Sequence, residues 1–314
     1  MENLLLCFNA IMPLLVLMLL GYLLKRVDFI PKAGFEAIDK LCFRIFIPVV
    51  LFSNVYGADF STQFHAGAMG FMAVATLGYF MVAFLVIPRV MRHSDREDIT
   101  TVIHGACHGN LAVLGMPLIS NLFGQEGLAV YSIMLACASP LINACMVFQH
   151  LYFRGDRIRP LKLIWNVIKS PFVVGTLAGL ACKLLGIRFP AFAQTALSNV
   201  KALATPLCLI GLGGSFAFSN IRQYFGKVAW SVAVKCILIP GVVLGIAVAL
   251  GFRDLVLASL MVLFCCPSAA STYSFCAGYG GNPPLASQIV VYSTVFSMAS
   301  MFAWVFGFLQ LGLI

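Results

Sequence analysis

The sequence predicts an all-α integral membrane protein, and three observations support this prediction. First, 61% of the 314 residues are hydrophobic and only 10% are charged, whereas soluble domains are about 45–50% apolar and about 25% charged. Second, ten apolar stretches are each long enough to cross a hydrocarbon core of about 30 Å. Third, basic residues alternate from loop to loop. The composition excludes a water-soluble enzyme, a nucleic-acid-binding module and a disordered regulator.

The ten apolar stretches predict ten transmembrane helices in a single membrane domain over residues 1–314. The first stretch lacks a basic leader and a small-residue cleavage site, so we expect it to be retained as a helix. The eleven cysteines form no C-x-x-C motif and are expected to be apolar filler inside the spans. The expected spans are 3–24, 35–56, 65–88, 99–123, 127–151, 163–186, 191–218, 228–250, 255–279 and 284–312.

The net charge of +9 is explained by membrane orientation. The loops that follow odd-numbered spans contain 12 Lys and Arg residues, and those that follow even-numbered spans contain 3. Because basic loops stay on the cytoplasmic side, we expect both termini outside a plasma (bacterial inner) membrane. The excess of Lys and Arg over Asp and Glu therefore does not indicate a nucleic acid partner.

Prolines recur at matching places in the two halves of the chain. Each half has a pair of prolines 35 residues apart, and each has a further proline in its fourth span. These residues are Pro13, Pro48 and Pro117 in the first half and Pro171, Pro206 and Pro267 in the second. A unit of five spans must insert upside down in its second copy. We therefore expect two inverted five-helix repeats, about 1–155 and about 160–314, as in secondary transporters that bind their substrate near the membrane midplane.

The fourth and ninth expected spans are interrupted by glycine and proline at corresponding places. Proline removes a backbone N–H, so such a break survives in hydrocarbon only where it is buried or lines a cavity. We expect each span to consist of two half-helices that cross, with Pro117 and Pro267 near the start of each second half. The alternative is a pair of proline-kinked helices that only pack together.

A half-helix that begins at the membrane midplane offers unpaired N–H groups and a partial positive charge, which suit an anion. We expect these helix ends and nearby neutral polar side chains to form the substrate site. Its candidate residues are Asn110, Pro117, Pro267, Ser268 and Ser271, with Thr272 beside them. Asn143, Ser53 and Asn54 are further candidates that could equally bridge helices.

Ionisable residues at depth are costly, which makes them candidates for a counter-charge. Lys201 lies about 15 Å and Lys235 about 10 Å along their spans. Either lysine could neutralise a bound anion, or could instead bond to carbonyls freed by Pro206 or Pro240. Spans 3, 4, 5, 9 and 10 contain no Asp or Glu, which disfavours sodium coupling.

His108 lies beside the break in the fourth span and could carry a coupling proton. The alternative is a neutral histidine bonded to the backbone or to a neighbouring amide. His104 lies on the same helix face, but two histidines without a third ligand do not make a metal site. His65, His93 and His150 lie near loops and are given no role. We expect no metal and no cofactor.

Motifs spread over about 300 residues resemble those of the auxin efflux carrier family, which joins bacterial malonate and malate permeases with plant PIN-type auxin carriers. One departure is Ser170-Pro171, where the family usually shows Asn-Pro. The matching residues are Pro13 with Gly21-Tyr22, Pro48 with Phe52, Asn110 with Gly115 and Pro117-Leu118, Thr205-Pro206-Leu207, Lys235 with Pro240, and Pro267.

The resemblance implies a scaffold of spans 1, 2, 6 and 7, through which the chain would form a homodimer. Spans 3–5 and 8–10 would form a mobile transport domain in which spans 4 and 9 cross, a plan similar to those of NhaA and the bile-acid symporters. It also implies that the substrate is a small organic anion with a carboxylate.

The expected function is that of a secondary active carrier that works by alternating access. The alternative is a sodium-coupled organic-anion symporter of the bile-acid type. Hydrolase and metalloprotease motifs are absent from the sequence, so we do not expect an enzyme. The substrate's identity, the direction of transport and the oligomeric state stay open at this point.

Overall fold

The computed structural model describes residues 2–57, 65–155, 165, 169, 171–214, 216 and 221–314. Its regular structure over these residues is helical, apart from one isolated β-bridge. The segments are α1 (Glu2–Arg26), α2 (Lys32–Leu41), η1 (Cys42–Phe46), α3 (Ile47–Gly57), α5 (Ala66–Val90), α6 (Arg96–Cys107), η2 (Leu111–Gly115), α7 (Met116–Arg154), α9 (Pro171–Leu184), α10 (Ala191–Gly214), α11 (Ile221–Ala233), η3 (Val234–Leu238), α12 (Ile239–Ala249), α13 (Asp254–Cys265), α14 (Thr272–Tyr279) and α15 (Pro283–Gln310).

Six helices of the described residues are long and apolar enough to cross a membrane, fewer than the ten spans that the sequence predicts. They are Asn3–Arg26, Ala66–Val90, Leu111–Arg154, Ala191–Gly214, Gln223–Ala249 and Pro283–Gln310. The numbers differ partly because some expected spans are divided into shorter helices, such as α13 and α14. In addition, α7 joins the end of the fourth expected span to the fifth, with non-helical backbone at Phe123 and Gly124.

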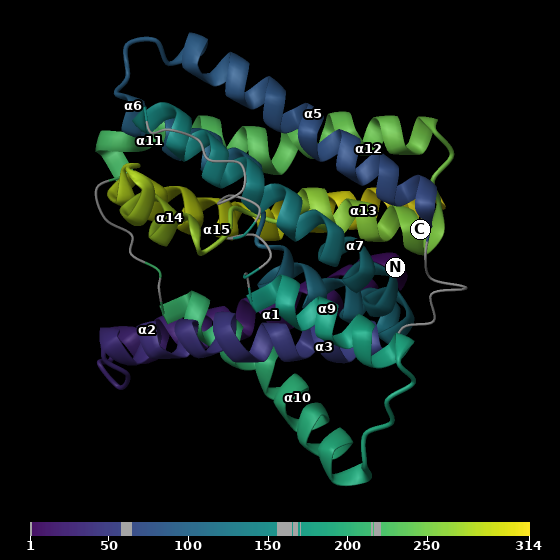
Figure 1. Cartoon of the computed structure of the whole chain (residues 1–314). Helices are drawn as coiled ribbons and strands as arrows, with labels where there is room; N and C mark the ends of the chain where they lie inside the picture. The colour runs from purple at the N-terminus through teal and green to yellow at the C-terminus, as the bar shows by residue number, and fades with distance from the viewer. Residues whose placement is uncertain are drawn as a thin grey trace.

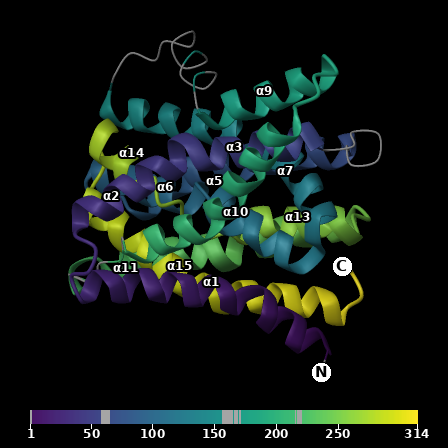
Figure 2. The same cartoon turned by 90° about the horizontal axis from the view of Figure 1, so that it is seen from below.

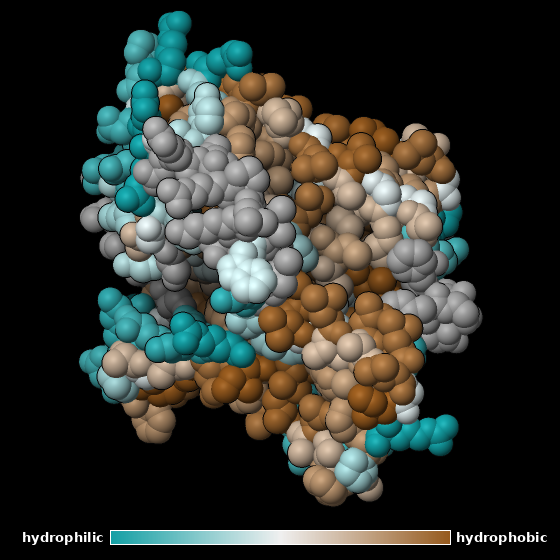
Figure 3. Space-filling model, viewed as in Figure 1, coloured by the Kyte–Doolittle hydropathy of each residue, from teal (hydrophilic) through white to brown (hydrophobic). Residues whose placement is uncertain are grey.

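Most of the long helices lie roughly along one direction, whereas α10 runs obliquely away from them, and both chain termini lie at the same end of the molecule (Figures 1 and 2). Large apolar side chains face outward, and Val74 and Val82 of α5 are examples. Hydrophobic residues cover much of the face seen in Figure 3, and hydrophilic residues gather at its left edge, over the ends of α2 and α6. This distribution suits a protein with several helices in a membrane.

Each of the three π-helical segments ends two residues before a proline. η1 precedes Pro48, η2 precedes Pro117 and η3 precedes Pro240. A proline ring clashes with the carbonyl four residues earlier and offers that carbonyl no N–H, so a wider turn relieves both problems. Before Pro240, the freed carbonyl of Cys236 accepts a hydrogen bond of 3.3 Å from the Trp304 indole.

Two pairs of helices, α1 with α10 and α3 with α9, approach each other closely through glycine. Gly213 of α10 lies against the Met18 carbonyl of α1, where a Cβ atom has no room. A Cβ at Gly175 or Gly179 of α9 would lie 2.5 Å from the carbonyl oxygen of Pro48 or Phe52. These glycines allow backbone-to-backbone packing of the kind found between membrane helices.

We expect Gly179→Ile to destabilise the protein by about 1–3 kcal/mol, because the added side chain must displace the backbone of α3. The measurement is thermal unfolding of the purified protein in detergent, followed by tryptophan fluorescence. Gly78→Ile on α5 is the control, since a Cβ there meets open space. Equal melting temperatures for the two variants would show that the contact is looser than described.

Candidate functional site

The two interrupted helices meet at their breaks. α6 ends at Cys107 and α13 ends at Cys265, and the extended segments that follow them lie side by side. The backbone N–H of Asn110 donates to the Pro267 carbonyl at 2.7 Å, and the backbone N–H of Ala269 donates to the His108 carbonyl at 2.8 Å. Gly109 and Ser268 form an antiparallel bridge between these two bonds. We call residues 108–110 and 266–271 the crossing.

The two prolines lie close to the starts of the helices that follow the breaks. The first break lies at the crossing, and Pro117 comes later, in the first turn of α7 after η2. The π-helical turn accommodates Pro117 without a further break. Pro267 lies inside the second break, before α14 begins at Thr272. Its carbonyl is an acceptor in the pairing, and its fixed φ suits extended backbone.

Asn110 brings a buried amide to the crossing. Its side chain is 3% exposed, and its Nδ2 atom has no hydrogen-bond partner among the described residues. The Oγ1 atom of Thr272, at the start of α14, is also buried without such a partner. An unpaired donor in an apolar interior is costly. These two groups can therefore bind a polar ligand at low desolvation cost.

Ser268 and Ser271 differ in their availability. Ser268 is fully buried, and its hydroxyl donates to the Gly105 carbonyl at 2.6 Å while its amide donates to Ser293 Oγ at 3.1 Å. These bonds fix the second break against α6 and α15. Ser271 is partly exposed and its carbonyl accepts from the Phe275 amide at 2.9 Å, so it begins α14.

Lys235 places an amine beside the crossing. It lies in η3, is 2% exposed, and a Cβ on Gly109 would be 3.2 Å from its Nζ atom. No ion pair joins it to a carboxylate of the described residues. A buried ammonium without a counter-charge is strongly unfavourable. Lys235 is therefore a suitable partner for an anion at the crossing.

Lys201 has a different environment from Lys235. Its Nζ donates to the Gln125 side chain at 3.2 Å, next to the non-helical backbone of α7. Asn54 also contacts α7, since its amide donates to Ser132 Oγ at 2.9 Å. Asn54 therefore bridges helices. Ser53 Oγ is buried without a partner among the described residues, and Asn143 is a partly exposed residue of α7.

Three histidines form a hydrogen-bonded chain that begins at the crossing. His104 Nε2 is 2.9 Å from His108 Nδ1, and His104 Nδ1 is 3.0 Å from His150 Nε2. His150, which the sequence places near a loop, is drawn into this chain from the last turns of α7. α7 continues to Arg154, so His150 lies inside a helix and is fully buried against α6.

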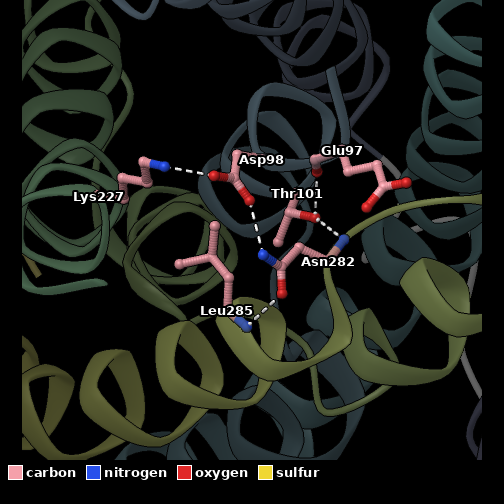
Figure 4. A network of polar contacts seen from close by, with 6 residues as sticks. All are labelled: Glu97, Asp98, Thr101, Lys227, Asn282 and Leu285. Atoms are coloured by element: carbon pink, nitrogen blue, oxygen red, sulfur yellow. Dashed lines mark hydrogen bonds and ion pairs between the residues drawn. The ribbon is translucent and has the colours of Figure 1, made fainter. Parts of the chain in front are cut away.

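A polar network that sequence reasoning missed joins α6, α11 and α15 (Figure 4). Asp98 is paired with Lys227 and accepts from Asn282 Nδ2 at 2.7 Å. Asn282 Oδ1 accepts from the Leu285 amide at 3.0 Å and caps α15. Thr101 Oγ1 donates to the Glu97 carbonyl and accepts from the backbone N–H of Asn282. The only local signals for this network are an acidic first turn in α6 and an Asn before two prolines.

Comparison with known proteins gives matches along nearly the whole chain. A sequence model of the family described as Membrane transport protein matches residues 6–305. An uncharacterized transporter of Methanothermobacter thermautotrophicus is 25% identical over 300 residues, covering 94% of this chain and 96% of that protein. A Rhizobium meliloti protein provisionally named a malonate transporter is 19% identical over 299 residues, 93% of each chain. The uncharacterized transporter YfdV of Escherichia coli K12 is 21% identical over 292 residues, covering 90% of this chain and 86% of that protein.

We expect the Asp98–Lys227 pair to stabilise the protein by about 0.5–3 kcal/mol in a double-mutant cycle. Asp98 is nearly buried, so removing either partner leaves a poorly solvated charge or donor. Asp98→Asn, Lys227→Met and the double variant are compared by thermal unfolding in detergent. The double variant should melt no lower than the worse single variant.

The exposed pair Lys32–Glu36 is the control for this cycle, because its side chains are 85% and 67% exposed. Such surface pairs contribute about 0–1 kcal/mol. Strictly additive effects of Asp98→Asn and Lys227→Met would contradict the network.

Proposed function

Because the chain belongs to the Membrane transport protein family, the auxin efflux carrier family to which its motifs are similar, we propose that it is a secondary active transporter of a small organic anion. The substrate binds at the crossing, where broken helices α6–η2 and α13–α14 pair. The single observation that supports this site is the buried Lys235 amine beside Gly109, without a carboxylate partner among the described residues.

A carboxylate matches the chemistry of the crossing. Its oxygens accept a charge-assisted hydrogen bond from Lys235 Nζ and further bonds from Asn110 Nδ2 and the Thr272 hydroxyl. α14 begins at Thr272, so its first N–H groups add a partial positive charge. Malonate is the first substrate to test, because one relative is named for its transport.

The proposed movement is alternating access by two groups of helices. The scaffold consists of α1, α3, α9 and α10, which pack through the glycines of α9 and α10. The transport group consists of α5–α7 and α11–α15, and the Asp98 network and the crossing hold its parts together. In this proposal each group contains helices from both of the inverted five-helix repeats, which cover residues of about 1–155 and about 160–314.

The proposed topology puts both termini outside the plasma membrane, as the alternation of basic loops indicates. The scaffold is also the proposed dimer face. Lys201 stays outside the substrate site in this proposal, because its amine is bonded to Gln125 of α7.

The experiment is uptake and counterflow of radiolabelled malonate in liposomes that contain the purified full chain. A panel of mono- and dicarboxylates competes with malonate, and uncharged amides of the same size serve as controls. Counterflow that only carboxylates inhibit supports the proposal. Replacing sodium by choline separates it from a sodium symporter of the bile-acid type. Failure of every carboxylate in the panel to exchange would exclude the proposed function.

We expect Lys235→Met to weaken malonate binding by about 30-fold or more, because it removes the charge that holds the carboxylate. Asn110→Ala should weaken it by about tenfold through loss of one hydrogen bond to a charged ligand. Binding is measured by isotope displacement on the purified protein.

Lys32→Met is the matched control for Lys235→Met, since Lys32 is exposed and paired with Glu36. Lys235→Met should fold normally, because replacing a buried charge by an apolar side chain of similar size is often neutral or stabilising. Wild-type affinity in both crossing variants would place the substrate elsewhere.

A further inference from the structure

In the histidine chain, the imidazole rings of His108, His104 and His150 are hydrogen-bonded to one another in a row. The central His104 uses both of its nitrogens, one toward His108 and one toward His150. His108 and His150 each use one nitrogen, so each keeps its second nitrogen at an outer end of the chain. An imidazole nitrogen donates or accepts according to its tautomer. A hydrogen-bonded row of imidazoles can therefore pass a proton from ring to ring.

The rings are enclosed by apolar and aromatic groups. His104 and His150 are fully buried, and His108 is partly exposed. Phe275 of α14 packs on His104 with ring centroids 5.0 Å apart, and Tyr279 packs on His150 at 6.2 Å. His150 Nδ1 is buried without a partner among the described residues. The enclosure leaves the rings themselves as the path for a proton.

The titratable groups around the chain lie on several elements. Lys235 of η3 lies beside His108, because its Nζ atom is 3.2 Å from the Cβ position of the next residue, Gly109. Cys107 precedes His108 on α6, and the Tyr79 hydroxyl of α5 donates to the Cys107 carbonyl. α14 contributes Tyr279, and the end of α7 contributes Arg154, whose stem lies 3.6 Å from the Cβ position of Gly280.

Lys235 links the histidine chain to the substrate site. Because Lys235 Nζ lies next to Gly109, a second positive charge on the adjacent His108 is unfavourable while the lysine charge is unneutralised. A carboxylate bound to Lys235 removes this repulsion and adds attraction. Proton loading at His108 and anion binding at the crossing therefore favour each other, which is a reciprocal coupling between two sites.

We propose that His108, His104 and His150 form a relay that takes up one proton with the anion and carries it toward the end of α7. This inference rests on the proposed function. A proton binds His108 Nε2, and the proton on His108 Nδ1 moves to His104 Nε2. The proton on His104 Nδ1 then moves to His150 Nε2, and His150 holds the extra proton as an imidazolium. His150 gives up its buried Nδ1 proton to water that reaches this atom when the transport group moves. One proton enters and one leaves, and the tautomers reset by ring rotation.

The first test measures protons and anion together in liposomes that contain a trapped pH dye. Malonate addition to the wild type should move protons with malonate. His104→Gln should lower this proton movement by about 100-fold, because glutamine bonds to both neighbours but passes no proton. Malonate counterflow should persist, because an exchange of malonate for malonate does not require the proton to leave His108 through the relay. His150→Gln should behave in the same way, and His65→Gln, an exposed control, should match the wild type.

A second test needs no substrate. Nitrogen NMR of the full chain with ¹⁵N-labelled histidine, in lipid bilayers, should detect couplings across both ring-to-ring hydrogen bonds. It should also show exchange between the two tautomers of His104, and His104→Gln should remove these signals. A single fixed tautomer at His104 would identify a structural contact and overturn the relay.

The two tests separate the proposals from each other. Absence of counterflow with every carboxylate would reject the proposed function, and the NMR experiment would then decide the relay alone. Wild-type counterflow together with undiminished proton movement in His104→Gln and His150→Gln would reject the relay and leave the proposed function in place.

Discussion

The backbone pairing at the crossing is the contact on which the rest of the structure depends. A helix interrupted in hydrocarbon leaves N–H and C=O groups that cost several kcal/mol each when unpaired. Here the backbone N–H of Asn110 donates to the carbonyl of Pro267 in the other break. The carbonyl of His108 accepts from the backbone N–H of Ala269. Because each break supplies the other's partners, neither is stable alone. The pairing therefore fixes α6, α7, α13 and α14 relative to one another.

This arrangement places polar groups in the interior, where apolar side chains would have a lower free energy of burial. Lys235, Asn110 and His108 gather around a few residues of extended backbone in the buried interior of the protein. A buried ammonium and an unpaired amide both lose free energy by leaving water. A bound carboxylate compensates for both at once. Under the proposed function, the same groups make the empty site unfavourable and the anion-bound site favourable.

The sequence predicted features that depend on local chemistry and missed those that depend on distant partners. Glycine and proline marked both breaks, and Asn110 and Lys235 stood out as polar residues in apolar spans. The contact of His150 with His104 was not predicted, because the two residues are 46 positions apart and lie on different helices. The pairing of Asp98 with Lys227 likewise spans 129 residues.

Three side-chain hydrogen bonds between the proposed scaffold and transport group end in one short part of α7. Asn121 donates to the Ala10 carbonyl of α1, Gln125 accepts from Lys201 of α10, and Ser132 accepts from Asn54 of α3. These bonds surround Phe123 and Gly124, where α7 departs from helical geometry. Gly124 has a positive φ and no side-chain obstruction, so the chain can bend there. In the proposed alternating access, a movement of the transport group must break or rearrange these bonds, and the bend at Gly124 lies among them.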